Sequence, residues 1–150
     1  MPHKGGTIYK TAREVAGLTQ ERASVALHLS VRSLAAYETG ERIPADDVVV
    51  RMMDCYNYPV LAAQHLRQTS TLARSIVPEL EERSVLEVAV RIYNRLNRIE
   101  RKGGIDRLME IAEDGQIDQD ERLDFDAIME DLREIVKSGL ELEVYCGKEK

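Results

Sequence analysis

The chain is 150 residues long, which is enough for one well-packed core or two small ones. It is 43% hydrophobic with one Phe and no Trp, so we expect a mostly α-helical protein with an aliphatic interior. The formal net charge of −6 argues against a uniformly basic, nucleic-acid-binding surface. There is no run of about 18 apolar residues and no charged-then-apolar leader, so we expect no membrane span or signal peptide and a cytoplasmic location.

The first short helix within residues 18–40 is predicted from about Gln20 to His28. Thr19 is a good cap for this helix because its hydroxyl can accept a hydrogen bond from an unpaired backbone N–H. Glu21 then places a carboxylate in the first turn, where the helix dipole favours negative charge.

A second short helix is predicted over residues 31–39. Ser30 can cap its start, and Leu34 and Tyr37 form its buried face. Gly40 can adopt the positive φ that commonly ends a helix. We expect the Tyr37 ring to lie in the core rather than to stack on a base.

Two helices this short are not stable alone, so neighbouring segments must hold them. The apolar residues before them are Ile8, Ala12 and Val15. Those after them are Val48, Val49, Met52 and Met53.

This stretch resembles, without a gap, the helix-turn-helix of the lambda-repressor-like family, also called the Cro/CI or XRE family. Residues 18–21 open the first motif helix, Ser30 begins the recognition helix and residues 37–40 close it, with Pro44 where the family commonly has a proline. The resemblance covers roughly residues 7–66 and implies a five-helix DNA-binding domain. Double-stranded DNA is therefore the expected partner.

Two positions depart from the family pattern. His28 stands where the family usually has the turn glycine, so the turn must tolerate an imidazole, with strain or positive φ. Ala23 stands where a larger aliphatic residue is usual, so the local core is expected to be thinner or filled from elsewhere.

The resemblance implies a set of DNA-contacting residues. Among positions that match base-facing ones, Arg32 can donate two bonds to guanine, Val31 can pack on a thymine methyl, and Ala36 permits close approach. Gln20 and Ser30, at the start of the two motif helices, match positions that commonly touch the sugar-phosphate backbone of DNA. Arg42, just after the second helix, is a further candidate for a phosphate contact. The alternative for each polar residue is an ordinary solvated side chain. The full set is Gln20, Ser30, Val31, Arg32, Ser33, Ala36 and Arg42.

Charge is distributed unequally along the chain. Residues 1–70 contain 8 basic and 7 acidic residues, whereas residues 71–150 contain 13 and 20. The weakly basic first half predicts modest DNA binding by one copy, so two copies are expected to bind together.

The second half is predicted to be a helical hairpin. Val85, Ala89, Ile92, Leu96 and Ile99 recur at heptad-like spacing, and Gly103 with Gly104 ends this helix. A short amphipathic segment follows, with Ile105, Leu108, Met109 and Ala112. Asp118 and Glu121 form a capping-box variant before a last helix that carries Phe125, Ile128, Leu132 and Ile135 on one face.

The two long helices have complementary charges. Residues 83–107 carry 7 basic and 3 acidic groups, and residues 108–134 carry 2 and 11. Antiparallel packing would bring Arg91, Arg95 and Arg98 near the acidic helix, although each exposed pair contributes only about 0 to 1 kcal/mol.

Apolar residues outside the main stripe, Met129, Val136 and Leu140, favour a homodimer in which two hairpins form a bundle. The alternative is that the hairpin folds back on the first domain. This half is also similar to the tails of some phage-type regulators of Firmicutes-like bacteria. We therefore divide the chain into a DNA-binding domain (1–68), a linker (69–82) and a helical oligomerisation or interaction region (83–150).

Residues 114–121 resemble the later part of an EF-hand loop. Counting back places Glu110 and Ala112 at the first and third ligand positions, where Ala112 cannot bind calcium, so we expect a capped turn. The two cysteines, Cys55 and Cys146, form neither a disulfide framework nor a CxxC zinc site.

No catalytic constellation is apparent, and we expect neither an enzyme nor a bound cofactor or metal. His3, His28 and His65 lack a triad or metal-cluster arrangement, and we expect His65 on a helix surface or at an interface. Residues 142–145 are predicted to form either a short strand or the end of the last helix.

Three functions remain open. The first is a bacterial or phage-type transcriptional regulator, a repressor that binds operator DNA as a dimer. The second is an antitoxin that represses its own operon and uses the acidic half to neutralise a protein partner. The third is a helical interaction module that does not bind DNA.

Overall fold

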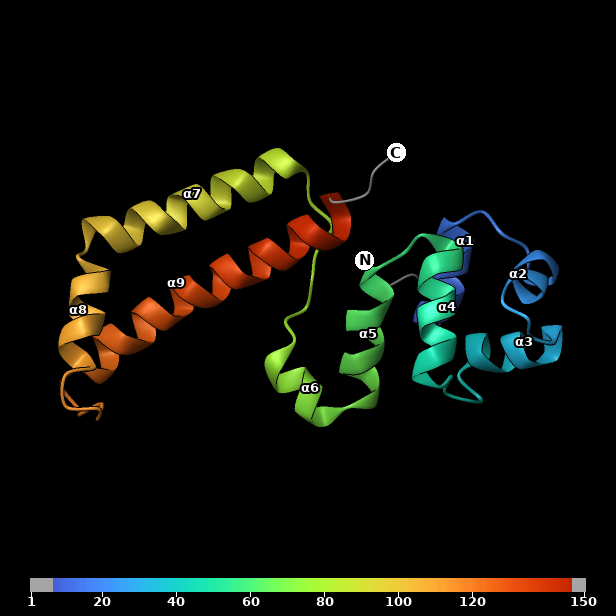
Figure 1. The fold of residues 1–150 in the computed structure, drawn as a ribbon, viewed down its shortest axis with the longest axis horizontal. Coiled ribbons are helices and arrows are strands. Elements are labelled where there is room, and N and C mark those ends of the chain that lie inside the picture. The colour runs from blue at the N-terminus through green and yellow to red at the C-terminus, as the bar shows by residue number, and fades with distance from the viewer. Residues whose placement is uncertain (1–6, 147–150) are drawn as a thin grey trace. The chain divides into compact units, whose positions relative to one another are not determined.

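The computed structural model describes residues 7–146, and every regular element among them is helical (Figure 1). This confirms the all-α fold class. The chain divides into two compact units, Met1–Glu79 and Leu80–Lys150. A short helix, α6 (Thr71–Ile76), lies within the segment that was predicted as the linker. No helix of the described part is long and apolar enough to cross a membrane.

Five further helices build the N-terminal unit: α1 (Ile8–Val15), α2 (Gln20–Ala26), α3 (Val31–Thr39), α4 (Asp46–Tyr56) and α5 (Val60–Thr69). They surround one apolar core, as lambda-repressor-like domains are expected to do. The core residues are Tyr9, Ala12, Ala23, Leu27, Leu34, Tyr37, Val48, Val49, Met52, Tyr56 and Leu61.

The face of α1 agrees in part with the predicted one. Ala12 is buried and Ile8 packs against the core, as expected, and Tyr9 and Arg13 are buried with them. Val15, also expected to hold the short helices, is 66% exposed, so that prediction was wrong. Val48, Val49 and Met52 of α4 are buried as expected.

His65 of α5 lies in the interior, so its predicted place on the surface was wrong. The ring is 4% exposed and forms two hydrogen bonds. Its Nδ1 lies 2.8 Å from the hydroxyl of Tyr9 on α1, and its Nε2 lies 3.1 Å from a carboxylate oxygen of Asp46 on α4. His65 therefore joins three helices, and both ring nitrogens are satisfied.

The C-terminal unit is the predicted helical hairpin. α7 (Val85–Arg101) and α9 (Arg122–Glu141) run antiparallel, with α8 (Gly104–Ile111) between their ends (Figure 1). Gly103, with φ of 59°, makes the turn from α7 into α8. The last residues that the structure describes form a π-helical turn, Leu142–Cys146, rather than a strand.

The face that α7 buries overlaps only partly with the predicted stripe. Ile99 of that stripe is buried and Ile92 is half-buried, and Val88, which was not predicted, is buried with them. Val85 and Leu96 of the predicted stripe are instead 58% and 53% exposed. The buried face passes through Arg95, which pairs with Asp131 of α9 at 2.8 Å. α7 is apolar around more than half of its circumference, so spacing alone could not identify the buried part.

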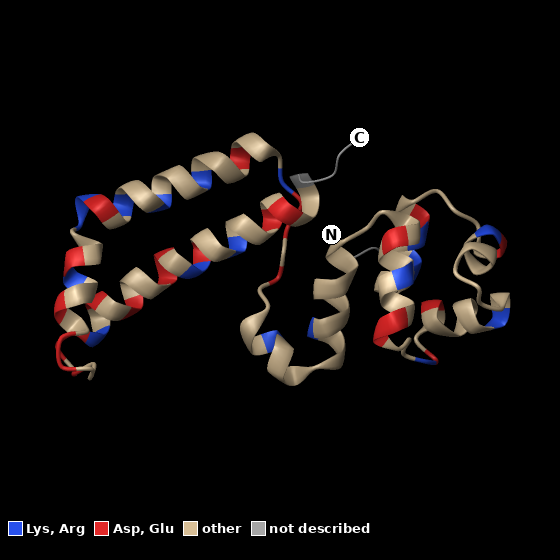
Figure 2. Ribbon diagram, viewed as in Figure 1, with Lys and Arg blue, Asp and Glu red and all other residues tan. Residues whose placement is uncertain are grey.

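Ion pairs join α7 and α9 in the way that the charges predicted. Figure 2 shows the basic residues along α7 and the acidic residues along α9. Arg91 contacts Glu134 at 2.9 Å, and both Arg95 and Arg98 donate to Asp131. Asp131 is 7% exposed and accepts from two guanidinium groups, so it is better desolvated than a typical surface partner.

A buried carboxylate, that of Glu141, joins the end of α9 to the start of α7 and the segment before it. Glu141 is fully buried, and its Oε1 accepts a hydrogen bond from the backbone N–H of Glu81 at 3.0 Å. Arg83, Arg91 and Lys137 place charged nitrogens within 3.8 to 3.9 Å of this carboxylate. Three cations compensate for the desolvation of one buried anion.

The turn before α9 is capped as predicted. Asp118 accepts a bond from the backbone N–H of Glu121 at 3.0 Å, and the Glu121 side chain accepts from the N–H of Asp118 at 3.3 Å. Asp114 likewise accepts from the N–H of Gln116. Asp118 lies four residues before Arg122, so the box stabilises the turn that leads into α9 rather than its first turn.

Candidate nucleic-acid interface

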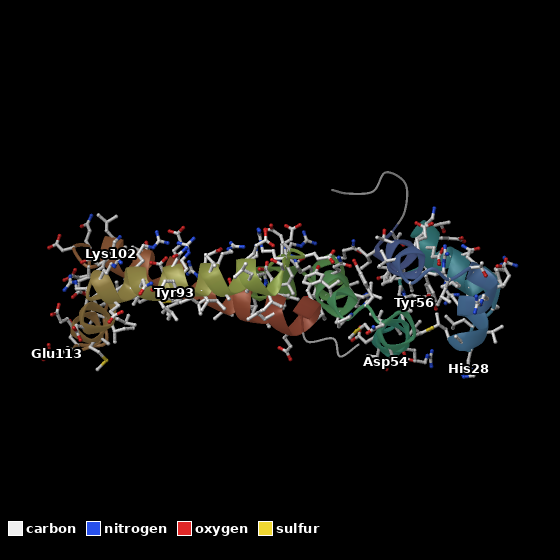
Figure 3. The ribbon with its side chains drawn as sticks, turned by 90° about the horizontal axis from the view of Figure 1, so that it is seen from above. His28, Asp54, Tyr56, Tyr93, Lys102 and Glu113 are labelled. Atoms are coloured by element: carbon white, nitrogen blue, oxygen red, sulfur yellow. The ribbon has the colours of Figure 1, made fainter. Side chains whose placement is uncertain are left out.

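The turn between α2 and α3 fixes the orientation of α3. α2 ends at Ala26, slightly earlier than predicted, because His28 adopts a φ of 55° and reverses the chain. The side chain of His28 is exposed at this turn (Figure 3). His28 thus has the left-handed backbone conformation that a glycine would adopt without strain.

Both motif helices have the predicted caps. The Thr19 hydroxyl accepts from the N–H of Arg22 at 3.3 Å, and the Ser30 hydroxyl accepts from the N–H of Ser33 at 3.0 Å. α3 begins and ends at the predicted residues, and Gly40 ends it with a φ of 80°. These local signals set where the exposed end of α3 begins.

The start of α3 brings several candidate residues together. Ser30, Val31 and Arg32 are exposed on consecutive positions, and Ser33 is half-buried. Ala36 is only 9% exposed, so its methyl group presents little surface to a partner. The exposed end therefore combines a guanidinium, two hydroxyls and one β-branched apolar side chain.

Leu34 and Tyr37 anchor α3 in the core from its opposite face, and Leu34 is fully buried. This anchoring leaves the side chains of the first turn directed away from the core. A helix that is held on one face and exposed at its N-terminal end can approach a nucleic-acid groove without unfolding.

Gln20 has an internal partner. Its side-chain nitrogen donates to Glu38 Oε2 at 2.9 Å, and Glu38 is buried beside Arg13. A primary amide has two N–H groups, so one of them and the carbonyl oxygen remain for a phosphate or water. The contact fixes the amide at the start of α2.

Arg42 lies directly after α3 and is exposed. Its guanidinium carbon lies 5.7 Å from the centre of the Tyr37 ring, and its backbone N–H donates to the carbonyl of Ala36 at 3.1 Å. The backbone contact holds the loop against α3, and the ring contact orients the cation.

The described cations of this unit fall into three groups. Lys10, Arg13 and Arg51 have acidic partners within the chain. Arg67 and Arg74 donate to backbone carbonyls of residues 67–77. In the part of the unit that the structure describes, no ion pair involves Arg22, Arg32 or Arg42. These three lie on α2, on α3 and directly after α3, so this edge offers three arginines without an acidic partner, beside the exposed acids Glu21 and Glu41.

Arg22 was not predicted as a contact residue. It is exposed in the first turn of α2, where its backbone N–H donates to the Thr19 cap. The only sequence signal was an arginine two residues after Gln20.

Comparison with known protein families agrees with this geometry. Residues 10–67 match a family described as a helix-turn-helix domain. These residues form a helix-turn-helix domain of the XRE/Cro type. The match extends from α1 into α5, so the helix-turn-helix domain includes the whole core described above. No curated protein and no solved structure matches the chain.

Two titratable side chains of the helix-turn-helix domain, Cys55 and Tyr56, lie beside or within its core. Among the described residues, no group of three or more His, Cys, Asp or Glu side chains could hold a metal ion. Burial raises the pKa of the Cys55 thiol and of the Tyr56 hydroxyl above their ordinary values. Both groups therefore stay neutral at physiological pH and belong to the core and its edge.

Proposed function

We propose that the chain is a transcriptional regulator of bacterial or phage type that binds operator DNA through α3. The exposed first turn of α3, locked from behind by Leu34 and Tyr37, carries this proposal. In the proposed complex, Arg32 donates to guanine in the major groove and Val31 contacts a thymine methyl. Bound operator would exclude other proteins, so the regulator acts as a repressor in the cytoplasm.

The backbone contacts in this proposal come from both motif helices. The Ser30 hydroxyl donates to Ser33 Oγ at 2.9 Å, so Ser33 and the second N–H of Gln20 donate to phosphate oxygens, and Arg22 and Arg42 add charge on either side. Ala36 allows the helix to approach closely without donating a bond. These contacts set the register of α3 on the duplex, and Arg32 supplies most of the sequence preference.

Binding as a dimer follows from the small number of base contacts that one copy can make. One strong base-reading side chain gives about 1 to 3 kcal/mol of discrimination, which is small against the number of competing sites in a genome. Two copies on a palindromic site double the base and phosphate contacts.

A selection from random DNA sequences at moderate salt tests this function. The wild type is expected to enrich a palindromic site, and Arg32→Ala is expected to lose the enrichment. Arg51→Ala is the matched control, because Arg51 is an arginine of α4 that pairs with Asp47 at 3.6 Å. A wild type that enriches no site would overturn the proposal and favour an interaction module.

The antitoxin alternative is less well supported by the C-terminal unit. That alternative needs an acidic surface for a basic partner. Asp124, Asp131 and Glu134 pair with arginines of the same unit, which leaves mainly the acids of the exposed turn at residues 113–120 for such a partner. We therefore prefer the regulator, and a basic protein that co-purifies in stoichiometric amount would reverse this preference.

A further inference from the structure

The C-terminal unit shields few apolar side chains. In the part that the structure describes, its buried apolar residues are Val88, Ile99, Ile111 and Ile128. The α7–α9 contact also includes buried polar groups, among them Asp131 and Ser138. Small units with so little buried apolar surface usually need a further source of stability, such as a second subunit.

α7 exposes an apolar stripe along most of its length. Leu86 is 73% exposed and Tyr93 is 65% exposed, and Val90 lies between them at helical spacing. Ala89 and Leu96 extend the stripe on one side. A continuous apolar stripe of this size on a helix marks an interaction surface.

The net charges at the two ends of this stripe have opposite signs. Glu82 lies just before α7 and Glu87 in its first turn, while Arg83 between them pairs with Glu81. At the other end, Arg101 and Lys102 outnumber the one acid, Glu100, and Arg98 is engaged by Asp131 (Figure 2). Figure 3 shows Tyr93 between these ends and Lys102 just beyond the last turn. The surface therefore has a net negative charge at one end, is apolar in the middle and has a net positive charge at the other end.

Such a surface is complementary to itself only when two copies run antiparallel. Glu87 and Arg101 are 14 residues apart, which is two heptads, so they lie on the same side of the stripe. A two-fold axis near Tyr93 then brings Glu87 of one copy toward Arg101 of the other. A parallel pair would instead bring the two basic ends together, with like charges opposed.

We propose that α7 packs antiparallel against α7 of a second copy of this chain, with Tyr93 near the two-fold axis. The apolar stripe forms the centre of the contact, and the charged ends pair across it as an isologous interface. The two hairpins then contribute four long helices. This inference specifies the dimer of the proposed function, but it concerns the C-terminal unit and holds without DNA.

The length of α7 sets the expected strength of this contact. Its 17 residues form a helix about 25 Å long. The area that two such helices can bury lies at the small end of the range for stable protein interfaces. We therefore expect a dissociation constant on the order of micromolar for the free protein.

Sedimentation equilibrium of the full chain without DNA tests the surface. The wild type is expected to form dimers, and Tyr93→Asp is expected to weaken them by about 30-fold or more, because it opposes two charges at the axis. Leu123→Asp is the matched control, since Leu123 is an apolar residue of α9 that is 81% exposed, and it should leave the dimer intact. Circular dichroism should show equal helicity in all three proteins.

Cross-linking tests the orientation. In a Cys55→Ser, Cys146→Ser background, differently tagged copies carrying Leu86→Cys or Arg101→Cys are mixed and treated with a short bis-maleimide. Cross-links between positions 86 and 101 are expected. A monomeric wild type, an unaltered Tyr93→Asp dimer, or cross-links that join position 86 only to itself would each overturn the proposal. Because no DNA is present, failure of operator binding leaves these outcomes unchanged.

Discussion

The guanidinium of Arg13 donates hydrogen bonds to both carboxylate oxygens of Glu38, with nitrogen to oxygen distances of 2.6 and 2.9 Å. Both side chains are buried, and Arg13 also donates to the carbonyl of Leu18 at 2.6 Å. Gln20 adds a third donor to Glu38. One buried ion pair thus joins α1, the start of α2 and the end of α3, and it fixes α3 within the helix-turn-helix domain.

Loss of Glu38 should be costly. Glu38→Ala leaves the Arg13 cation buried without its partner, so we expect the free energy of unfolding to fall by about 3 to 5 kcal/mol. Urea denaturation measures this change. The double variant Arg13→Met, Glu38→Leu should recover most of the loss because no unpaired charge remains. A loss below about 1 kcal/mol for Glu38→Ala would show that the pair does not hold the motif.

His28→Gly should stabilise the helix-turn-helix domain. The φ of 55° is unfavourable for an imidazole-bearing residue, and glycine adopts it readily, so we expect a gain of about 0.5 to 1 kcal/mol in unfolding free energy. His28→Val should be destabilising, because a β-branched residue tolerates positive φ poorly. If all three proteins share one urea midpoint, the turn is not strained.

The start of α7 should depend on pH. Hydrogen bonds from the backbone N–H and hydroxyl of Ser84 hold the pKa of Glu87 below its ordinary value of 4.5. The capping contact therefore stabilises α7 above pH 4.5 and is lost as pH falls through the lower pKa of the folded state. An NMR titration of the Glu87 carboxyl should show the low pKa, and Ser84→Ala should raise it. An unchanged pKa in Ser84→Ala would contradict this role.

Arg22, Arg32 and Arg42 should determine the salt dependence of DNA binding. Three cations per copy in a dimer predict a slope of about −5 for log K against log salt concentration. Arg22→Ala should reduce the magnitude of the slope by about 2 per dimer without changing the preferred sequence. Fluorescence anisotropy at several salt concentrations measures the slope, and the Arg51→Ala protein should behave as the wild type. An Arg22→Ala slope equal to that of the wild type would remove this residue from the interface.

Local signals allowed the helix-turn-helix domain to be predicted from sequence. The hydroxyls of Thr19 and Ser30 cap the residues that follow them, and Gly40 takes positive φ within its own turn, so each feature depends on near neighbours. The burial of His65 could not be predicted in this way. Its partners are Tyr9 and Asp46, which lie 56 and 19 residues away in the sequence.

The face of α7 illustrates a different limit. Heptad spacing identified an amphipathic helix, but apolar residues occupy two adjacent stripes, and the spacing fits both. The α9 carboxylates decide which stripe is buried, because Asp131 draws Arg95 into the contact and leaves Leu96 on the outside. Arg22 was missed for a related reason, since its exposure without an ion pair among the described residues is known only from the structure.

The most direct measurement of the central claim is the affinity of the Arg32→Ala protein for the operator site that the wild type selects. If α3 reads bases through Arg32, the dissociation constant should rise by about 10- to 100-fold. The preference for guanine at one position in each half-site should also disappear, while Arg51→Ala retains both. Equal affinity and equal base preference in Arg32→Ala and wild type would contradict the account.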